Sequence, residues 1–367
     1  MKIALLEPFL GGSHRQWAEG WQRHSHHEIR IFGLPGRHWK WRMHGGAVTL
    51  ARQLAESGFR PDLLLTTDML DLAAFLGLAR SYLANIPVAV YFHENQLAYP
   101  WSPDDPDPHL KRDNHYSFLN FTTALAADRV FFNSPYNRDS FLGALPAFLG
   151  AFPDYREQEQ LAGLAEKCEV LPLGLDLRRF DAVRGPQMPP GPPLLLWNHR
   201  WEYDKGPEAF FRTVGELAEE GYDFRLAVVG EKYRRVPPAF GRAKEQLRRH
   251  LVRWGYVADF AEYAALLQQA DILPVTSQQD FFGGSVVEAM YCGAFPLLPD
   301  RLAYPMHVPT AMRKSVLYAT EAEFKRKLRK CLAESGPELP VREWVAGYDW
   351  SVMAPQYDAR MEKLAAK

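Results

Sequence analysis

Cysteine is scarce in this 367-residue chain, which carries only Cys168, Cys292 and Cys331. The three are far apart, odd in number and form no CxxC pair. A disulfide framework needs an even set of cysteines, and structural zinc sites need closely spaced cysteine pairs. The sequence therefore gives no sign of either, and it favours a reducing compartment such as the cytosol.

Long apolar runs are also missing. No stretch reaches the roughly 18 apolar residues that a membrane-spanning helix requires. The opening "MKIALLEPFLGG" is too short an apolar run for a signal peptide, and Glu7 interrupts it. We therefore expect a soluble cytoplasmic protein that has no membrane partner.

An excess of one charge is absent as well, because 43 Lys and Arg face 44 Asp and Glu, for a formal net charge of -1. A protein that binds nucleic acid through a general positive coat has a different balance, so such a partner must be held by a local patch. Hydrophobic residues make up 47% of the chain, enough for the cores of two domains of ordinary size.

Short apolar runs alternate with helical patterns along the chain, which predicts α/β domains with parallel sheets. Expected strands of the first half are 2–9, 28–34, 62–68, 87–95, 129–134 and 168–176, with helices at 72–84, 114–127 and 136–149. Five prolines and two glycines at 184–193 predict a linker. The alternation then resumes, with strands at 194–199, 224–230, 272–277 and 295–299 and helices at 206–221 and 259–270. We predict two tandem Rossmann-like, doubly wound domains, 1–183 and 194–343, with the active site in the cleft between them.

The stretch "SQQDFFGGSVVEAM" (277–290) places Asp280 directly after a predicted strand. Gly283 and Gly284 then lead into a helix that carries Glu288. Glycine allows close backbone approach, and the first N–H groups of a helix bind anions. The two acids can reach different parts of one extended ligand. The alternative is a helix that merely starts at a glycine and carries a surface glutamate.

Two cations follow the first strand of the second domain in "WNHRWEYDKGPEAF" (197–210). Arg200 and Lys205 precede a helix that is expected to start near Pro207. Cations beside a helix N-terminus suit a diphosphate. The alternative is a solvated loop with two ordinary surface cations.

The first domain offers weaker signals. His93 and Glu94, in "YFHENQLAYP", follow a predicted strand, where a histidine is a candidate for contact with reacting groups. It can equally be structural. Gly11 and Gly12 allow a phosphate to approach the backbone, but they form no full GxGxxG and no Walker lysine follows.

The stretch "GRHWKWRMHGG" (36–46) combines cations for phosphates with flat rings for unstacked bases. Its members are Arg37, Trp39, Lys40, Trp41 and Arg42. Either it binds RNA or it is a basic loop in which a tryptophan packs inward. A second basic region, 232–255, has eight Lys or Arg against one Glu and is expected to include a helix with a solvated basic face.

These residues match known families. The second domain resembles the family 4 retaining glycosyltransferases, whose signature is an acid, seven residues and then Glu, here Asp280 to Glu288. Arg200, Lys205 and "GLDLRRF" (174–180) also fit that pattern. In the first domain, "EPFLGGSHRQWAEG", "RHWKWRMHGG", "HENQLAYP" and "FFNSPYNRDSFL" resemble the tRNA-queuosine mannosyltransferases, and the resemblance covers nearly the whole chain.

The resemblance implies a GT-B type fold with an acceptor-binding first domain and a nucleotide-sugar-binding second domain. It also implies that a helix at 344–367 packs back on the first domain. The expected donor is GDP-mannose, and the expected acceptor is queuosine in the anticodon loop of a tRNA. Neither a metal, a further cofactor nor an obligate protein partner is expected. Retaining enzymes of this class are thought to react on one face of the sugar, so no covalent nucleophile is assigned.

The resemblance also assigns roles to residues. Asp280 would bind sugar hydroxyls, Glu288 the donor ribose, and Tyr256 would lie near the base. The expected catalytic residues are His93, Arg200, Lys205 and Asp280. The expected donor-binding residues are Gly11, Gly12, Ser13, Arg200, Lys205, Gly230, Tyr256, Asp280, Phe281, Phe282, Gly283, Gly284, Ser285 and Glu288. The expected acceptor-binding residues are His14, Arg37, Trp39, Lys40, Trp41, Arg42, His93, Glu94, Asn95 and Gln96.

The sequence departs from the family pattern at three points. Asp280 stands where the family usually has Glu, "FFGGSVVEAM" differs from the commoner Phe-Gly-Leu-Pro turn, and Met306 stands where Glu is expected after Tyr-Pro. These departures leave the donor sugar open. The alternatives are a glycosyltransferase for a glycan or small molecule, and a non-catalytic protein that binds a nucleotide sugar or RNA. "HSHH" (24–27) and "SPDDPDPH" (102–109) have metal-ligand residues, but both are interpreted as solvated turns.

Overall fold

The computed structural model describes residues 1–83, 85–102, 105–110, 114–183, 189–232, 236–334 and 339–366. It divides into two compact units. Unit 1 consists of Met1–Asp176 together with Trp350–Lys367, and unit 2 is Leu177–Asp349. Residues 184–188 of the predicted linker lie outside the described residues, and residues 189–193 form neither helix nor strand.

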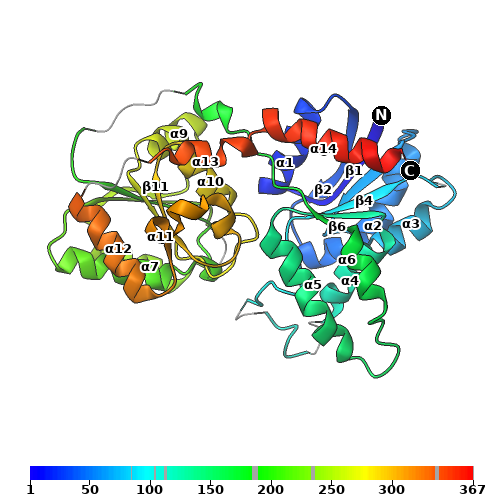
Figure 1. Ribbon diagram of the computed structural model, residues 1–367, viewed down its shortest axis with the longest axis horizontal. Helices are drawn as coiled ribbons and strands as arrows, with labels where there is room; N and C mark the ends of the chain where they lie inside the picture. Colours follow the sequence, from blue (N-terminus) through cyan, green and yellow to red (C-terminus); the bar gives the residue numbers. More distant parts are fainter. Residues whose placement is uncertain are drawn as a thin grey trace. The chain divides into compact units, whose positions relative to one another are not determined.

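Unit 1 is built on a six-stranded parallel sheet with the order β2-β1-β3-β4-β5-β6 (Figure 1). Its strands are β1 (Lys2–Leu10), β2 (Glu28–Pro35), β3 (Leu63–Thr67), β4 (Val88–Phe92), β5 (Arg129–Phe132) and β6 (Cys168–Val170). The central strands are mostly apolar because helices cover both faces of such a sheet, with Glu7 of β1 and Thr66 and Thr67 of β3 as buried polar exceptions. The strand order reverses between β1 and β3, and ligands of doubly wound sheets bind at this switch point, beyond the carboxyl ends of the strands.

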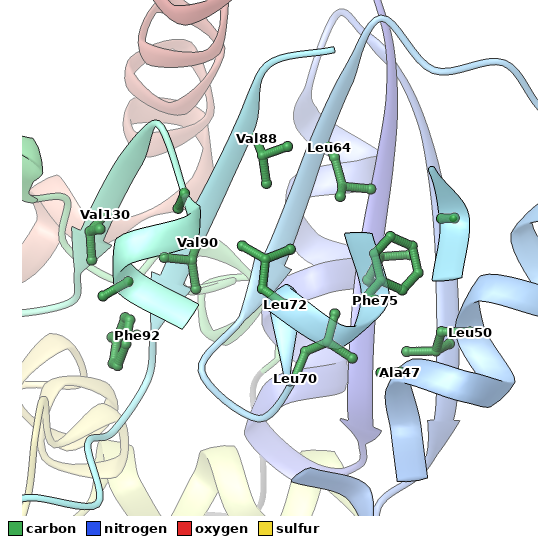
Figure 2. Close-up of a cluster of buried hydrophobic side chains, with 14 of the residues drawn as sticks. Ala47, Leu50, Leu64, Leu70, Leu72, Phe75, Val88, Val90, Phe92 and Val130 are labelled. Carbon is green, nitrogen blue, oxygen red and sulfur yellow. The ribbon is translucent and has the colours of Figure 1, made fainter. Parts of the chain in front are cut away.

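The helices of unit 1 are α1 (Gly12–His24), α2 (Trp39–Glu56), α3 (Leu72–Ala79), α4 (Asn114–Ala126), α5 (Pro135–Gly150), α6 (Gln160–Lys167) and α14 (Trp350–Ala365). One face of the sheet packs against α2, α3 and α4. Figure 2 shows this core, in which Leu64 and Val88 of the sheet lie near Leu72 and Phe75 of α3 and Leu50 of α2. Leu72 and Phe75 belong to the helix predicted at 72–84, whereas α2 was not predicted.

Helix α14 covers α1 although more than 300 residues separate them in sequence. Trp17 Nε1 donates a hydrogen bond to the Tyr357 hydroxyl at 3.1 Å, and Trp21 Nε1 donates to Asp358 Oδ1 at 2.9 Å. The close approach requires Gly20, where an added Cβ would lie 2.1 Å from Trp350 Nε1. The C-terminal helix is thus an integral part of unit 1.

Unit 2 has a second six-stranded sheet with the order β12-β11-β10-β7-β8-β9. Its strands are β7 (Leu194–Asn198), β8 (Arg225–Val229), β9 (Leu251–Gly255), β10 (Ile272–Pro274), β11 (Phe295–Pro299) and β12 (Leu317–Tyr318). Its α-helices are α7 (Pro207–Glu219), α8 (Pro238–Gln246), α9 (Phe260–Gln268), α10 (Gly284–Tyr291), α11 (Arg313–Val316), α12 (Glu321–Glu334) and α13 (Val341–Val345). Short 3-10 helices occupy Arg178–Phe180, Tyr203–Lys205, Tyr304–His307, Thr310–Met312 and Ala346–Tyr348.

The predicted α/β class with two doubly wound parallel sheets is confirmed. Two strands escaped the sequence patterns. β9 lies in the basic region at a sheet edge, where charged residues interrupt the apolar run, and β12 has only two residues. Among the described residues, none of the helices has the length and apolar character needed to cross a bilayer.

One of the two alternatives for the stretch 36–46 was a basic loop, and this is wrong beyond His38. Trp39 begins α2, because Met43, Ala47, Leu50 and later residues continue a buried helical stripe from this point. His38 caps the helix start with a left-handed backbone, φ 58°. The side chains of the basic stretch are therefore fixed by a helix.

Candidate active site

In unit 2, Asp280 lies in the loop between β10 and α10. Its Oδ2 accepts a hydrogen bond from the Tyr304 hydroxyl at 3.1 Å and lies 3.4 Å from Lys205 Nζ. Burial alone would raise the pKa of this carboxyl, but Lys205 and the Tyr304 hydrogen bond contribute to a net lowering. Asp280 is thus a largely buried carboxylate that is held ionised, which suits it to accept hydrogen bonds from hydroxyl groups.

Lys205 is only 6% exposed. Its Nζ donates a hydrogen bond to the Gln279 carbonyl at 2.7 Å and lies 3.2 Å from Asp204 Oδ2. The ammonium therefore faces Asp204 and Asp280 together. The sequence predicted a cation for a ligand diphosphate, whereas the structure shows a cation that also neutralises two buried acids of the protein.

Arg200 is the more exposed of the two predicted cations. Its side chain is 43% exposed, and its Nη1 lies 3.2 Å from Glu202 Oε2. It follows the carboxyl end of β7, the edge of the sheet where ligands of such folds bind. Arg200 is thus placed where a planar guanidinium can reach an anionic group of a ligand.

Two glycines allow the loops beyond β7, β8 and β10 to touch. At Gly230, φ is 147° and an added Cβ would lie 1.8 Å from the His199 carbonyl oxygen. At Gly206, φ is 65° and an added Cβ would lie 2.4 Å from the Thr276 carbonyl oxygen. Both positions need glycine for conformation and for space. Gly230 was predicted to contact the donor, and the structure gives a second, structural reason for a glycine at this position.

His199 lies next to this cluster as a buried neutral imidazole. Burial, with the positive charges of Lys205 and Arg200, lowers its pKa to about 3. Its Nδ1 lies 3.5 Å from Ser285 Oγ, while its Nε2 has no hydrogen-bond partner among the residues that the structure describes. The sequence reasoning passed over His199, although it directly precedes Arg200 in the quoted motif.

The loop before α10 and the helix itself hold five further predicted donor residues beside Asp280: Phe281, Phe282, Gly283, Gly284 and Ser285, together with Glu288 on the helix. Gly283 caps α10 with φ 87°, followed by Gly284 and Ser285, while Phe281 and Phe282 are buried. Glu288 Oε1 accepts a hydrogen bond from Arg179 Nη2 at 2.7 Å, and its Oε2 accepts one from the Tyr263 hydroxyl at 3.0 Å. Both oxygens of this carboxylate are thus fixed in place. Tyr256, beyond β9, is exposed.

The stretch Tyr304–His307 supports the loop before α10. This support was not predicted from the sequence. His307 is buried, and its Nε2 donates a hydrogen bond to the Phe282 carbonyl at 2.6 Å. Burial lowers the pKa of His307 to about 4 despite the neighbouring Asp280. The available signal was the motif "YPMH", whose tyrosine holds Asp280 and whose histidine holds the backbone two residues later.

In unit 1, the buried Glu7 and the largely buried His14 form a pair at the switch point of the sheet. Glu7 Oε1 accepts hydrogen bonds from Phe9 N at 2.8 Å and Thr67 Oγ1 at 3.2 Å, while Oε2 lies 3.0 Å from His14 Nδ1. Burial alone would lower the pKa of His14, but the charge and hydrogen bond of Glu7 raise it to about 9. His14 is therefore an imidazolium at neutral pH.

His93 follows β4 and packs against His14, with 4.2 Å between the ring centroids. Burial and the positive charge of His14 lower the pKa of His93 well below its ordinary value. Its backbone N–H donates to Asp68 Oδ1 at 2.8 Å, and its Nε2 has no hydrogen-bond partner within the described part of the chain. Burial, and then Glu94, raise the pKa of Asp68. The cluster thus pairs one charged with one neutral imidazole.

A network of buried asparagines fixes the loop that carries His93. Asn133 Nδ2 donates to the His93 carbonyl at 2.8 Å, Asn95 Nδ2 donates to Asn137 Oδ1 at 2.8 Å, and Gln96 N donates to Asn120 Oδ1 at 2.8 Å. A further hydrogen bond of 2.9 Å joins Gln96 Nε2 to Glu94 Oε1. The sequence assigned residues 94–96 to the acceptor, while the structure shows Asn95 buried in this support.

The glycine loop after β1 leads into α1. Gly11 is the N-cap, and an added Cβ on Gly36 would lie 2.8 Å from Gly11 Cα, so the two backbones touch. Gly12 begins the helix with φ 50° and has open space where a Cβ would point. Ser13 follows on the first turn. The loop thus leads directly into the N-terminus of α1, and binding of an anion there stays a prediction.

The five residues of the basic stretch take different positions. Lys40 contacts Asp105 Oδ1 at 2.6 Å and also Asp107, so its charge is neutralised within unit 1. Trp39 packs against Tyr116 with 5.0 Å between ring centroids. Trp41 is 64% exposed. The remaining two are Arg37, which is exposed, and Arg42, which is half-buried.

The interpretation of 102–109 as a solvated turn is also wrong for Asp107, which is buried against Lys40. Residues 103 and 104 lie outside the described residues. A lysine and two aspartates 65 residues apart meet here, which no local pattern could predict.

Comparison with known proteins assigns the chain to a family. Residues 2–175 match the family described as tRNA-queuosine alpha-mannosyltransferase N-terminal, and residues 192–334 match glycosyl transferases group 1. A tRNA-queuosine alpha-mannosyltransferase of Drosophila melanogaster is 35% identical over 338 residues, which cover 89% of this chain and 85% of the relative. The chain belongs to the tRNA-queuosine alpha-mannosyltransferase family. This family member is a glycosyltransferase, and glycosyltransferases of this kind use a nucleotide sugar as the donor.

Other similarities of this tRNA-queuosine alpha-mannosyltransferase family member are more distant. A 2-deoxystreptamine glucosyltransferase of Streptomyces kanamyceticus is 28% identical over 56% of this chain and 51% of the relative. Sucrose-phosphate synthase of Thermosynechococcus elongatus has a TM-score of 0.73 at 16% identity, covering 100% of this chain and 99% of the other. Trehalose-6-phosphate synthase OtsA has a TM-score of 0.70 at 12% identity, with 99% of each chain covered. The GT-B type fold expected from the sequence is thereby confirmed.

Proposed function

We propose that this protein transfers mannose from GDP-mannose to queuosine in the anticodon loop of a tRNA, with retention at the sugar carbon. The observation that carries the proposal is the relative named for this activity, which is 35% identical and matched over 85% of its length. The N-terminal family region, residues 2–175, also spans the sheet of unit 1, which carries the residues predicted to bind the acceptor.

Unit 2 supplies the groups expected to bind the donor. Arg200 and the N-terminus of α10 offer positive charge to a diphosphate, and positive charge at that point stabilises the leaving group as the glycosidic bond breaks. Asp280 is held ionised by Lys205, which is itself a buried cation of the same cluster. We assign Asp280 to the sugar hydroxyls and Glu288 to the ribose, in agreement with their positions after β10 and on α10.

Unit 1 supplies the groups expected to act on the acceptor. His93 is a neutral imidazole whose Nε2 has no hydrogen-bond partner among the described residues, and His14 beside it is a cation paired with Glu7. The positive charge of His14 disfavours a second proton on His93. His93 is therefore kept in the form that can exchange a hydrogen bond with a sugar or acceptor hydroxyl at neutral pH.

The tRNA itself requires cations and exposed rings. Trp41 offers an exposed ring on α2, and Arg37 an exposed guanidinium just before it. In unit 2, the described part of the second basic region has four exposed cations along α8 and the turn that follows it: Arg242, Lys244, Arg248 and Arg249. These surfaces allow local binding of RNA although the net charge of the chain is -1.

The deciding experiment incubates the protein with GDP-mannose and total tRNA and then analyses the nucleosides. A new hexosylated queuosine is the expected product. Arg200→Ala should lower turnover by at least about 100-fold while the fold is retained. The matched control is Arg212→Ala, which removes a surface arginine paired with Glu321 and should leave turnover unchanged. Product on a glycan or small molecule, with none on queuosine-containing tRNA, would replace this proposal with the alternative acceptor.

A further inference from the structure

Four side chains gather where the chain leaves α1, on the side of unit 1 that α14 covers. Asp358 and Glu362 are one turn apart on α14 and face His26 and His27, which follow α1. His26 Nδ1 lies 2.9 Å from Asp358 Oδ2, and His26 Nε2 lies 2.9 Å from Glu362 Oε1. His27 Nε2 lies 3.5 Å from the same Glu362 oxygen. Two imidazoles thus share one pair of carboxylates.

Hydrogen bonds from residues of α1 and the turn after it fix the orientation of the Asp358 carboxylate. It is buried, and its Oδ1 accepts hydrogen bonds from Trp21 Nε1 at 2.9 Å and Ser25 Oγ at 2.6 Å. Oδ2 also accepts a hydrogen bond from the backbone N–H of His26 at 3.1 Å. Outer hydrogen bonds of this kind orient the ligands of protein-bound metals. Oδ2 is the oxygen that remains directed toward the histidines.

His27 supplies a second, independent observation. Its side chain is 3% exposed, and its Nε2 has no hydrogen-bond partner among the described residues. The other ring nitrogen, Nδ1, lies 3.4 Å from the amino nitrogen of Met1. Nε2 is therefore the nitrogen that faces the acids without a bond of its own.

We propose that His26, His27 and Asp358 bind a transition-metal ion of the Zn²⁺ type, with Glu362 beside it as a further oxygen ligand. One ligand atom from each of the three lies within 4.8 Å of the other two. Zn²⁺ bonds of about 2.0–2.2 Å to nitrogen and oxygen place tetrahedral ligands roughly 3.3 Å apart, so small rotations of the exposed His26 suffice. Two imidazoles with a carboxylate favour Zn²⁺ over Mg²⁺ or Ca²⁺, which prefer oxygen ligands alone.

The consequence is a metal clamp between segments that are distant in sequence. The metal would join the turn between α1 and β2 to α14, in addition to the contacts of Trp17 and Trp21 with that helix. The interpretation of "HSHH" as a solvated turn is wrong in any case, because His27 is buried and both histidines contact acids of α14. The site is separate from the residues assigned to donor and acceptor.

The test is a Zn²⁺ titration of the full-length protein after metal removal, followed by calorimetry and thermal unfolding. One equivalent of Zn²⁺ should bind and raise the Tm, and Co²⁺ should give the visible absorption of a tetrahedral nitrogen and oxygen site. His26→Ala should weaken binding by at least about tenfold and abolish the rise in Tm. Since His26 is 65% exposed, this variant should keep the fold of the metal-free protein, which circular dichroism checks.

Two further variants sharpen the result. Glu362→Gln should weaken Zn²⁺ binding less than His26→Ala does, because it removes only the additional ligand. His109→Ala, which removes an exposed histidine elsewhere in unit 1, should leave both the affinity and the Tm rise unchanged. The proposal is overturned if the parent protein binds no Zn²⁺, or if His26→Ala binds it as tightly as the parent.

Discussion

Replacing Glu7 with Gln should move the titration of His14 across neutral pH. The variant is nearly isosteric, and its amide oxygen can still accept the hydrogen bonds from Phe9 N and Thr67 Oγ1. Its amide N–H₂ replaces the carboxylate oxygen that lies 3.0 Å from His14 Nδ1. An amide donor in that place needs a lone pair on Nδ1, so it stabilises the neutral imidazole instead of the imidazolium.

The expected magnitude follows from the pKa of His14, which Glu7 raises against burial from 6.5 to about 9. At about 1.36 kcal/mol per pKa unit, this rise corresponds to roughly 3 kcal/mol of folding free energy. Since the folded pKa lies above the unfolded one, the stabilisation is complete below pH 6.5 and is lost as the pH rises through about 9. In Glu7→Gln, burial should instead lower the pKa of His14 below 6.5.

Two measurements test this reasoning. NMR titration of the histidine rings should place the pKa of His14 near 9 in the parent and below 6.5 in Glu7→Gln. Urea unfolding at several pH values should show the stability advantage of the parent shrinking by about 3 kcal/mol between pH 6.5 and 9.5. Glu19→Gln, which changes an exposed acid paired with Arg15, is the matched control and should alter neither. A His14 pKa that is the same in parent and Glu7→Gln would refute the argument.

Three further predictions concern other parts of the molecule. Gly230→Ala should lower the free energy of unfolding by at least about 2 kcal/mol, because the new Cβ meets a carbonyl oxygen. Gly221→Ala, at a position with a positive φ but open space, should lower it less, and urea unfolding compares the two variants. Trp21→Phe removes the donor to a buried carboxylate of α14 and should cost about 1–3 kcal/mol, and a thermal unfolding curve equal to that of the parent would contradict this. Replacing Arg37 and Arg42 with Ala should weaken tRNA binding and lower its salt dependence, while the Tm rise caused by GDP stays as in the parent.

The residues of the candidate site that could be located from the sequence are those directly after strands. Asp280, Arg200 and His93 all follow the carboxyl ends of strands, because the strand patterns were strong and parallel strands end at one edge. The groups that set their protonation were harder to find. Glu7 was taken as an interruption of an apolar run, yet it is the buried partner that charges His14.

Pairings over long sequence distances could not be predicted at all. Lys40 was counted as a cation for RNA, and only folding brings it to Asp105 and Asp107. Likewise, the acids that contact His26 belong to α14, at the other end of the chain. A single sequence shows which residues follow a strand, but it does not show which distant carboxylate a cation will contact.

The division of unit 1 into two segments has a consequence for its synthesis. The ribosome completes Leu177–Asp349 before it makes Trp350 and the helix that follows. At about 5–20 residues per second, this interval lasts roughly 9 to 35 s. Throughout it the indoles of Trp17 and Trp21 lack the Tyr357 and Asp358 partners that they have in the finished protein. Unit 2 can therefore fold on the ribosome as a continuous segment, whereas in unit 1 the side of α1 that α14 covers (Figure 1) stays uncovered until α14 emerges.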